Sequence, residues 1–384
     1  MRRQWMTRNL VILTLVSLTQ DAASELLYPL IPLLITVVLG APPIVLGLIE
    51  GAAEAAAGFT KLLSGKLSDR YGRKPFVSSG YWLAAVGKTF VVIASSWSVV
   101  LLGRVTDRIG KGLRSSPRDA LISDGIDKKD LGKAFGFHRA GDNLGAVIGP
   151  VFALLGLMIF DNDVKKVALF AIIPALLSGF LTFFVRESRV VVTEKIIHTK
   201  VPLSNSLKRT IALLTLIQLL NIPDVLILLR LSNIGFSAQH VVALYILYYL
   251  VATLSALPAG ALADRLPPAF AYAIGLSAFA LSYITLGLTQ NHKIAVLVIA
   301  IYGLFPAFTD GVGKSWIAKL STQNERGYAQ GVFQSAMNFA VLGAGIWGGA
   351  MWQKSAVELP LVIAGVGAIV GIAVLLVNHF RNRL

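Results

Sequence analysis

Apolar runs long enough to cross a lipid bilayer recur along this chain of 384 residues. A spanning helix needs about 20 mostly apolar residues. Only 14% of the residues are charged, against about 25% in soluble domains, so too little charge is available to cover a surface in water. We therefore predict an all-α membrane protein. Breaks at glycine, proline and charge clusters place twelve transmembrane helices near residues 10–39, 43–64, 75–94, 97–116, 133–158, 165–185, 209–231, 238–259, 269–289, 293–313, 326–350 and 357–379.

Lysine and arginine fall mostly on one side of these predicted helices. They gather at the N-terminus, in the loops after the second and fourth helices, in the segment 186–208 and at the C-terminus. Because cytoplasmic loops are enriched in these residues, we expect a multi-pass protein of the cell (inner) membrane with both termini in the cytoplasm. Contact with anionic membrane lipids accounts for the net charge of +15 without nucleic acid. The opposite side holds only Lys165, Lys166, Arg230, Lys293 and Lys354.

One long polar stretch, 186–208, divides the chain near its middle. We predict an N-terminal six-helix bundle at 1–185, a cytoplasmic linker at 186–208 and a C-terminal six-helix bundle at 209–384. Two six-helix halves repeated in parallel are typical of transporters that bind substrate near the middle of the membrane, where the repeats meet. A constant offset of 195 residues aligns the halves, carrying Gly40 to Gly235, Gly65 to Gly260, Asp69 to Asp264, Arg70 to Arg265, Gly136 to Gly331 and Asn143 to Asn338.

The loop after the second predicted helix carries the motif GKLSDRYGRK at residues 65–74. It resembles the G-x-x-x-D-R-x-G-R-R/K signature of the major facilitator superfamily, and the repeat keeps its first half as GALADR at 260–265. The resemblance implies the fold of that superfamily, a twelve-helix permease of the bacterial type. It also implies a gate in which Asp69 meets the start of the eleventh helix, near Arg326–Gln330, where a helix N-terminus is partly positive. The candidate gating residues are Gly65, Asp69, Arg70, Gly72, Arg73, Asp264 and Arg265.

A second motif, GAVIGP at 145–150, lies in the fifth predicted helix. It resembles the G-x-x-x-G-P core of a signature found in proton-driven exporters of the superfamily. Small residues at this spacing also let membrane helices pack closely. Both interpretations remain open for Gly145, Gly149 and Pro150.

Charged residues inside the predicted helices lie largely in the N-terminal half. The helical scaffold does not need them, because the C-terminal half lacks most of them and keeps few acidic candidates, such as Asp224 and Asp310. A charge facing lipid at mid-membrane costs about 2.5–3.5 kcal/mol on insertion scales, so we expect these residues to face one another or a water-filled cavity. The offset pairs Arg104 with Ile299, Asp107 with Tyr302, Arg108 with Gly303, Lys111 with Pro306, Glu50 with Tyr245 and Glu54 with Tyr249.

Spacing along the helices suggests roles for these charges. Arg104, Arg108 and Lys111 follow an i, i+4, i+7 pattern and share one stripe of the fourth helix, which suits an anionic substrate group. Carboxylates four residues apart lie together, where like charges favour uptake of a proton by one of them. The proton-coupling candidates are Asp21, Glu25, Glu50, Glu54 and Asp142. The substrate-binding candidates are Arg104, Asp107, Arg108, Lys111, Arg139, Tyr245, Tyr249 and Tyr302.

Structural roles compete with these assignments, since buried ion pairs can simply neutralise each other. Lys88 in the third helix is expected either to extend toward the membrane surface or to pair with a carboxylate. His138 suits either packing or a proton relay. Arg114 and Arg118, near the cytoplasmic mouth, are expected to serve orientation and lipid contact.

These features predict a secondary active transporter that works by alternating access. The first interpretation is proton-coupled export, as an antiporter, of a small amphiphilic or partly anionic organic compound. The alternative is proton-coupled uptake of an organic anion or a siderophore-like metal chelate, which the cationic stripe favours. Transport of a hard metal cation through Asp21 and Glu25 fits less well, because no histidine cluster accompanies them. An intramembrane enzyme is not expected, since Cys, HExxH and GxSxG are absent. We expect a monomer driven by the proton gradient, with no cofactor, bound metal or nucleic-acid partner.

Overall fold

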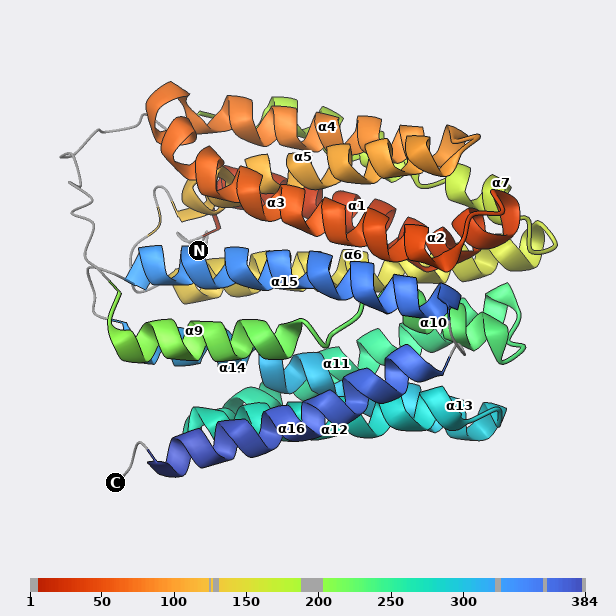
Figure 1. Ribbon diagram of the computed structural model, residues 1–384. Coiled ribbons are helices and arrows are strands. Elements are labelled where there is room, and N and C mark those ends of the chain that lie inside the picture. The colour runs from red at the N-terminus through yellow and green to blue at the C-terminus, as the bar shows by residue number, and fades with distance from the viewer. Residues whose placement is uncertain are drawn as a thin grey trace. The chain divides into compact units, whose positions relative to one another are not determined.

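Helices are the only regular secondary structure in the part of the chain that the computed structural model describes (Figure 1). The chain divides into two compact units. Unit 1 comprises Met1–Ala41 and Ala52–Ile196, and unit 2 comprises Pro42–Gly51 and Ile197–Leu384. The start of one long helix, α3, therefore groups with unit 2 and the rest of it with unit 1. The described residues are 6–123, 126, 131–187, 203–321, 326–354 and 358–381.

Unit 1 is a bundle of long helices joined through glycine contacts. Its pairs include α1 with α6 and α4 with α5. Gly145 and Gly149 of α6 lie against the α1 backbone, and Gly87 of α4 meets Gly103 of α5, so that a Cβ at any of these positions would collide with backbone. The GAVIGP motif thus packs helices, with Pro150 buried beside them. The elements are α1 (Arg8–Leu27), η1 (Tyr28–Leu30), α2 (Ile31–Leu33), η2 (Leu34–Val38), part of α3 (Pro43–Tyr71), α4 (Arg73–Ile93), α5 (Trp97–Ser123), α6 (Leu131–Ile159), α7 (Val164–Leu169), α8 (Ile172–Leu181) and η4 (Thr182–Phe184).

Unit 2 has a similar set of helices, several of them shorter. Its closest pairs are α12 with α16 and α12 with α14. Gly47 of α3 and Gly345 of α15 touch through their backbones, an approach that a Cβ on either residue would prevent. Besides the start of α3, the elements are α9 (Asn205–Gln218), α10 (Asp224–Asn233), α11 (Ala238–Arg265), α12 (Pro268–Leu288), α13 (His292–Tyr302), α14 (Leu304–Leu320), α15 (Arg326–Lys354) and α16 (Leu359–Arg381).

Every predicted transmembrane range contains helix in the structure. Nine helical segments among the described residues are long and apolar enough to cross a membrane. Large apolar side chains such as Phe180, Val370 and Val377 are exposed on the helices. Extensive exposed apolar surface suits contact with lipid. The prediction of an all-α, membrane-embedded protein is confirmed.

The predicted span 209–231 is not one helix. The chain leaves α9 and re-enters helix only at Asp224 of α10. In a continuous helix the Leu219 carbonyl would accept the N–H of Pro223, but proline has none. Trp347 Nε1 donates to that carbonyl instead, at 2.6 Å. The prediction of an unbroken helix here is therefore wrong, and the break is stabilised by a side chain of α15.

Two turns occupy equivalent positions in the sequences of the two units. Gly40 and Gly235, which are 195 residues apart, both have positive φ, at 64° and 102°. This left-handed conformation favours glycine. Each of the two follows a helical segment, shortly before the next long helix begins. The sequence offset therefore pairs positions that share a backbone conformation.

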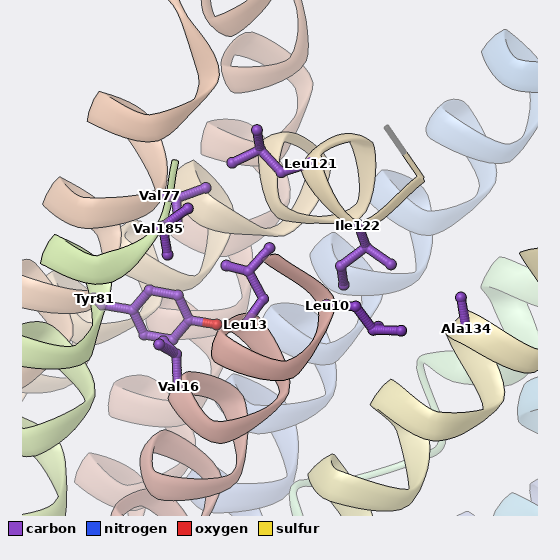
Figure 2. Close-up of a cluster of buried hydrophobic side chains, with 9 residues drawn as sticks. All are labelled: Leu10, Leu13, Val16, Val77, Tyr81, Leu121, Ile122, Ala134 and Val185. Atoms are coloured by element: carbon purple, nitrogen blue, oxygen red, sulfur yellow. The ribbon is translucent and has the colours of Figure 1, made fainter. Parts of the chain in front are cut away.

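A hydrophobic cluster ties together one end of unit 1 (Figure 2). It joins α1, α4, α5, α6 and the residue that follows η4. It fixes the end of α5, the helix that carries Arg104, Asp107 and Arg108. Its buried members are Leu10, Leu13, Val16, Val77, Tyr81, Leu121, Ile122, Ala134 and Val185.

Candidate functional site

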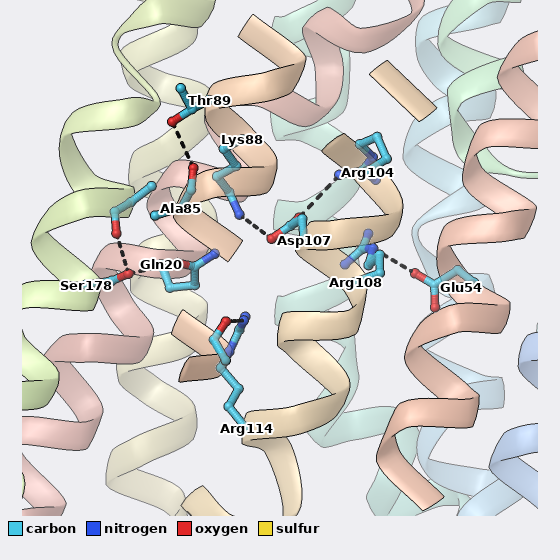
Figure 3. A network of polar contacts seen from close by, with 12 residues as sticks. Gln20, Glu54, Ala85, Lys88, Thr89, Arg104, Asp107, Arg108, Arg114 and Ser178 are labelled. Carbon is cyan, nitrogen blue, oxygen red and sulfur yellow. Dashed lines mark hydrogen bonds and ion pairs between the residues drawn. The ribbon is translucent and has the colours of Figure 1, made fainter. Parts of the chain in front are cut away.

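A buried ion network lies between α4 and α5 of unit 1 (Figure 3). Lys88 Nζ lies 2.7 Å from Asp107 Oδ1, and the two side chains are 1% and 4% exposed. Arg104 Nη1 lies 3.7 Å from the other carboxylate oxygen, Asp107 Oδ2. One carboxylate is thus shared by two cations. Of the two expectations for Lys88, pairing with a carboxylate is the one that the structure shows.

The close approach of α4 and α5 produces this network. Gly87 precedes Lys88, and its backbone lies against that of Gly103, which precedes Arg104. Because the backbones touch there, the Lys88 side chain reaches the carboxylate on α5 without leaving the interior of the unit. The Arg104 guanidinium also lies 5.6 Å from the centre of the Tyr28 ring, within the range of a cation–π interaction.

A second ion pair on the same stripe of α5 is more open. Arg108 Nε lies 3.3 Å from Glu54 Oε1 of α3, and the side chains are 14% and 27% exposed (Figure 3). Separating a buried pair leaves two charges without compensation, whereas water or a ligand can solvate a partly exposed pair. A ligand can therefore open the Arg108–Glu54 pair at lower cost than the Lys88–Asp107 pair.

Two further arginines of α5 point into unit 1. The Arg114 guanidinium lies 4.5 Å from the centre of the Tyr81 ring, and the residue is 5% exposed. Arg118 Nη1 donates to Ser17 Oγ at 3.1 Å, and the Ser17 and Tyr81 hydroxyls are 2.8 Å apart. The expectation of lipid contact for these arginines is wrong, because ring stacking and hydrogen bonds hold both guanidinium groups inside the bundle.

A histidine bridges two polar side chains near this group. His138 Nε2 lies 3.6 Å from Asp142 Oδ1, one turn along α6. His138 Nδ1 lies 3.4 Å from Thr14 Oγ1 of α1. Asp142 and His138 are both nearly buried. This geometry is compatible with packing and with a proton relay.

The predicted carboxylate pair of α3 stands on one continuous helix. Glu50 and Glu54 lie four residues apart within Pro43–Tyr71, so they share one face of α3. Glu54 pairs with Arg108, and Glu50 is buried. The other predicted residues of unit 1 are Asp21 and Glu25, which are half-buried on α1, and Lys111 and Arg139, which are exposed.

The signature loop contains a contact that sequence reasoning missed. Gly72 has φ 95°, which favours glycine, and it stands directly before α4. The Glu187 carboxylate accepts the first backbone N–H groups of α4, from Arg73 at 3.2 Å and from Lys74 at 2.9 Å. A carboxylate is favourable at a helix N-terminus. The sequence shows an acidic residue, Glu187, just after the sixth predicted helix, but it does not show which groups this carboxylate contacts.

The proposed latch lies largely outside the described side chains. For Gly65, Asp69 and Asp264 only the helical backbone is described, and the same holds for the first residues of α15. Arg70 and Arg265 are exposed. The contact of Asp69 with the eleventh helix remains a prediction.

In unit 2, tyrosines stand at the repeat positions of Asp107, Glu50 and Glu54. Tyr302 of α13 stacks on Tyr248 of α11 with ring centres 5.2 Å apart, and Tyr245 meets Tyr249 edge-on at 4.9 Å. Tyr302 Oη donates to Asp224 Oδ1 at 2.8 Å. The three tyrosines predicted to contact substrate thus belong to one aromatic cluster, which also contains an acid.

Comparison with known proteins identifies the family. The model of the Major Facilitator Superfamily matches the chain twice, over residues 13–228 and 210–383. The chain belongs to this superfamily. The two matches together cover almost the whole chain, one for each half, so the internal repeat and the signature loop now have a common explanation.

The relatives agree with this assignment. An uncharacterized MFS-type transporter of Methanocaldococcus jannaschii is 29% identical over 375 residues, which cover 95% of this chain and 93% of the relative. The multidrug resistance protein MdtH of Photorhabdus laumondii is 29% identical over 140 residues, 36% of this chain and 34% of MdtH. The nucleoside transporter NupG has a crystal structure that aligns with a TM-score of 0.80 at 14% identity, covering 97% of this chain and 99% of NupG. The protein is a membrane transporter with the fold of the superfamily.

Proposed function

We propose that this transporter moves a small amphiphilic organic compound with an anionic group, coupled to protons, by alternating access. The cation stripe of α5 carries the proposal. Arg104 and Arg108 lie inside unit 1 beside carboxylates, whereas the matching positions Ile299 and Gly303 are uncharged. Charges inside a membrane bundle are costly and usually functional. A stripe that the scaffold does not require therefore points to an anionic ligand.

The two ion pairs have different roles in this proposal. The Asp107 carboxylate is buried and lies 2.7 Å from Lys88. Its role in this proposal is to position Arg104, and it does not itself contact the substrate. The Arg104 guanidinium is planar and carries five N–H donors, which suits recognition of an anionic group. Arg108, in the more open pair, is the group that exchanges partners.

Exchange at Arg108 provides a means of coupling. When an anionic group takes the place of Glu54, the freed carboxylate loses its counter-charge, and a proton can neutralise it. Binding of the anion and of the proton then assist each other, and this assistance is reciprocal. Ligands that assist each other's binding cross the membrane together. The Arg108–Glu54 pair thus favours symport.

The direction of substrate transport distinguishes two candidate functions, uptake and export. An inward proton gradient makes symport an uptake process for an organic anion or a metal chelate, which the pair geometry favours. Export by antiport requires competition between proton and substrate, for which Asp21, Glu25 and Asp142 offer carboxylates. The similarity to MdtH, a multidrug resistance protein, supports export, as does the resemblance of the GAVIGP motif to exporters. We place uptake first because its support comes from this chain's own geometry.

The proposal includes a membrane orientation and an oligomeric state. Lys and Arg gather at both termini and in the segment 186–208, so we place these parts in the cytoplasm. We propose that one chain is the functional unit, because each half of the superfamily repeat is present in it.

The sign of proton movement tests the function. Proteoliposomes enclosing a pH-sensitive dye, with no initial pH gradient, would receive membrane-impermeant aromatic carboxylates and sulfonates outside, one at a time. Symport predicts acidification of the lumen as the anion enters, and antiport predicts alkalinisation. This sign does not depend on how the protein is oriented in the vesicle. Transport of an anion without any pH change would contradict proton coupling.

A further inference from the structure

Unit 2 contains a small cavity beside Asp224. Its volume is about 20 Å³, room for about one water molecule. The carboxylate stands in the first turn of α10, and Tyr245, Tyr248 and Tyr302 line the cavity together with aliphatic side chains such as Ile299. All of these residues belong to unit 2.

Asp224 accepts hydrogen bonds from tyrosines but has no opposite charge beside it in the described part of unit 2. One bond comes from Tyr302 Oη at 2.8 Å, and Tyr248 donates another. An ion pair elsewhere in unit 2 joins Arg230 to Glu358, and Arg230 also donates to the Leu286 carbonyl at 3.0 Å. Tyrosine hydrogen bonds leave the charge of this half-buried carboxylate without a cation, which is unfavourable beside apolar side chains. A cation in the cavity would compensate that charge.

The scaffold does not explain this arrangement. The 195-residue offset pairs Asp224 with Pro29, and it pairs Tyr248 with Ala53. The equivalent positions of unit 1 therefore fold without the carboxylate and without that ring. An ionisable residue inside a membrane bundle that packing does not require is a functional candidate with a partner to be identified.

We infer that the cavity binds a protonated primary amine of the substrate, with Asp224 as its counter-ion and the tyrosine rings as its walls. Tyrosine faces attract cations within about 6 Å of the ring centre, and an ammonium group supplies three N–H donors. Size selects among amines, because an NH₃⁺ group is about as large as a water molecule and a trimethylammonium group is several times larger. The amine is thus a specificity determinant. This inference rests on the transport function, but not on anion binding or proton coupling by unit 1.

Three probes test the site on the detergent-purified full chain at pH 7. Benzylammonium carries the proposed group, benzyl alcohol is its neutral counterpart, and benzyltrimethylammonium enlarges the cation. Isothermal titration calorimetry, with the same detergent solution as the blank, measures each affinity. Benzylammonium is expected to bind at least tenfold more tightly than either of the other two.

Variants of the lining separate the charge from the rings. Asp224→Asn should weaken benzylammonium binding at least tenfold, and Tyr248→Leu about threefold. Tyr248→Leu therefore reports on the site even if Asp224→Asn unfolds the protein. Tyr302→Phe keeps the ring and should change affinity less than threefold. Asp161→Asn, in an exposed turn where asparagine tolerates the positive φ, removes one negative charge as the matched control and should bind normally.

Several results would overturn the inference. They are equal affinities for benzylammonium and benzyl alcohol, tighter binding of the trimethyl cation, normal binding by folded Asp224→Asn, or no binding of benzylammonium by the unmodified chain. Failure here would leave the proposed function standing, because that function is tested with anions and proton flux.

Discussion

Matched positions in the two units carry opposite kinds of side chain. Where unit 1 has Arg104 and Asp107 of an ion network, unit 2 has the aliphatic Ile299 and Tyr302, which belongs to an aromatic cluster. The backbone turns at equivalent glycines are nevertheless alike in the two units. The superfamily scaffold thus sets where these positions lie, and it accepts either ions or rings there. Chemistry that differs between the repeats therefore reflects function more than folding.

The ion network and the aromatic cluster also differ in how much free energy a single substitution should cost. Removing one member of a buried ion pair costs about 3–5 kcal/mol, because the remaining charge is left uncompensated. An aromatic pair contributes about 0.5–1.5 kcal/mol beyond its buried area. The ion network of unit 1 should therefore respond to single substitutions more strongly than the aromatic cluster of unit 2.

The largest effect is expected at Asp107. Asp107→Asn leaves the buried Lys88 without its counter-charge and should lower the free energy of unfolding by about 3–5 kcal/mol. Tyr302→Phe, at the matched position of unit 2, should lower it by less than about 1.5 kcal/mol. Chemical unfolding in detergent measures both. The double variant Lys88→Met/Asp107→Leu should recover most of the loss, and equal losses at the two positions would contradict the energetic contrast.

The next effect concerns anion binding by α5. Arg108→Lys keeps the charge but loses the planar guanidinium, so affinity for the transported anion should fall by about tenfold to 100-fold. Arg118→Lys is the control, because Arg118 is bound to Ser17 and to Asp119 within unit 1. Binding isotherms that fall equally for both variants would show that the stripe is only a structural charge network.

A smaller effect is expected at the start of α4, and none at the start of α12. Glu187 accepts two N–H groups of α4, whereas α12 begins after Pro267, the repeat partner of Gly72. Glu187→Ala should destabilise the first turn of α4 by about 0.5–2 kcal/mol, and Glu187→Gln by less. Hydrogen exchange should accelerate at the start of α4 and stay unchanged at the start of α12. Unchanged protection of α4 would mean that the carboxylate does not cap it.

The smallest expected effect is a pH dependence at helix caps. The backbone N–H of Lys166 donates to Asp163 and, with the Lys166 ammonium, lowers the pKa of that carboxyl. A lowered pKa in the folded state adds stability that is present above the usual value of about 3.9 and lost as pH falls through the folded value. Protection of the first turn of α7 should therefore fall in acid, after correction for intrinsic exchange. The first turn of α13 is capped by Asn291, which does not titrate, and should not change. A parallel loss in both turns would point to general acid unfolding.

Sequence reasoning succeeded where the determining property is local. The length and apolarity of each run predicted the membrane helices, and helical periodicity placed Arg104 and Arg108 on one stripe. It failed where the determining property is contact between distant segments. The pairing of Lys88 depends on the meeting of Gly87 with its partner glycine on α5, and the Glu187 cap joins groups 113 residues apart.

The central claim is that anion binding and protonation are coupled through the Arg108–Glu54 pair. It is tested most directly by the protons taken up when a transported anion binds to the purified protein. Calorimetry in buffers of different ionisation enthalpy measures that number for the unmodified chain and for Glu54→Gln. The account predicts net proton uptake with the unmodified chain and none with Glu54→Gln, which should still bind the anion. Equal uptake by both proteins, or release of protons on binding, would contradict it.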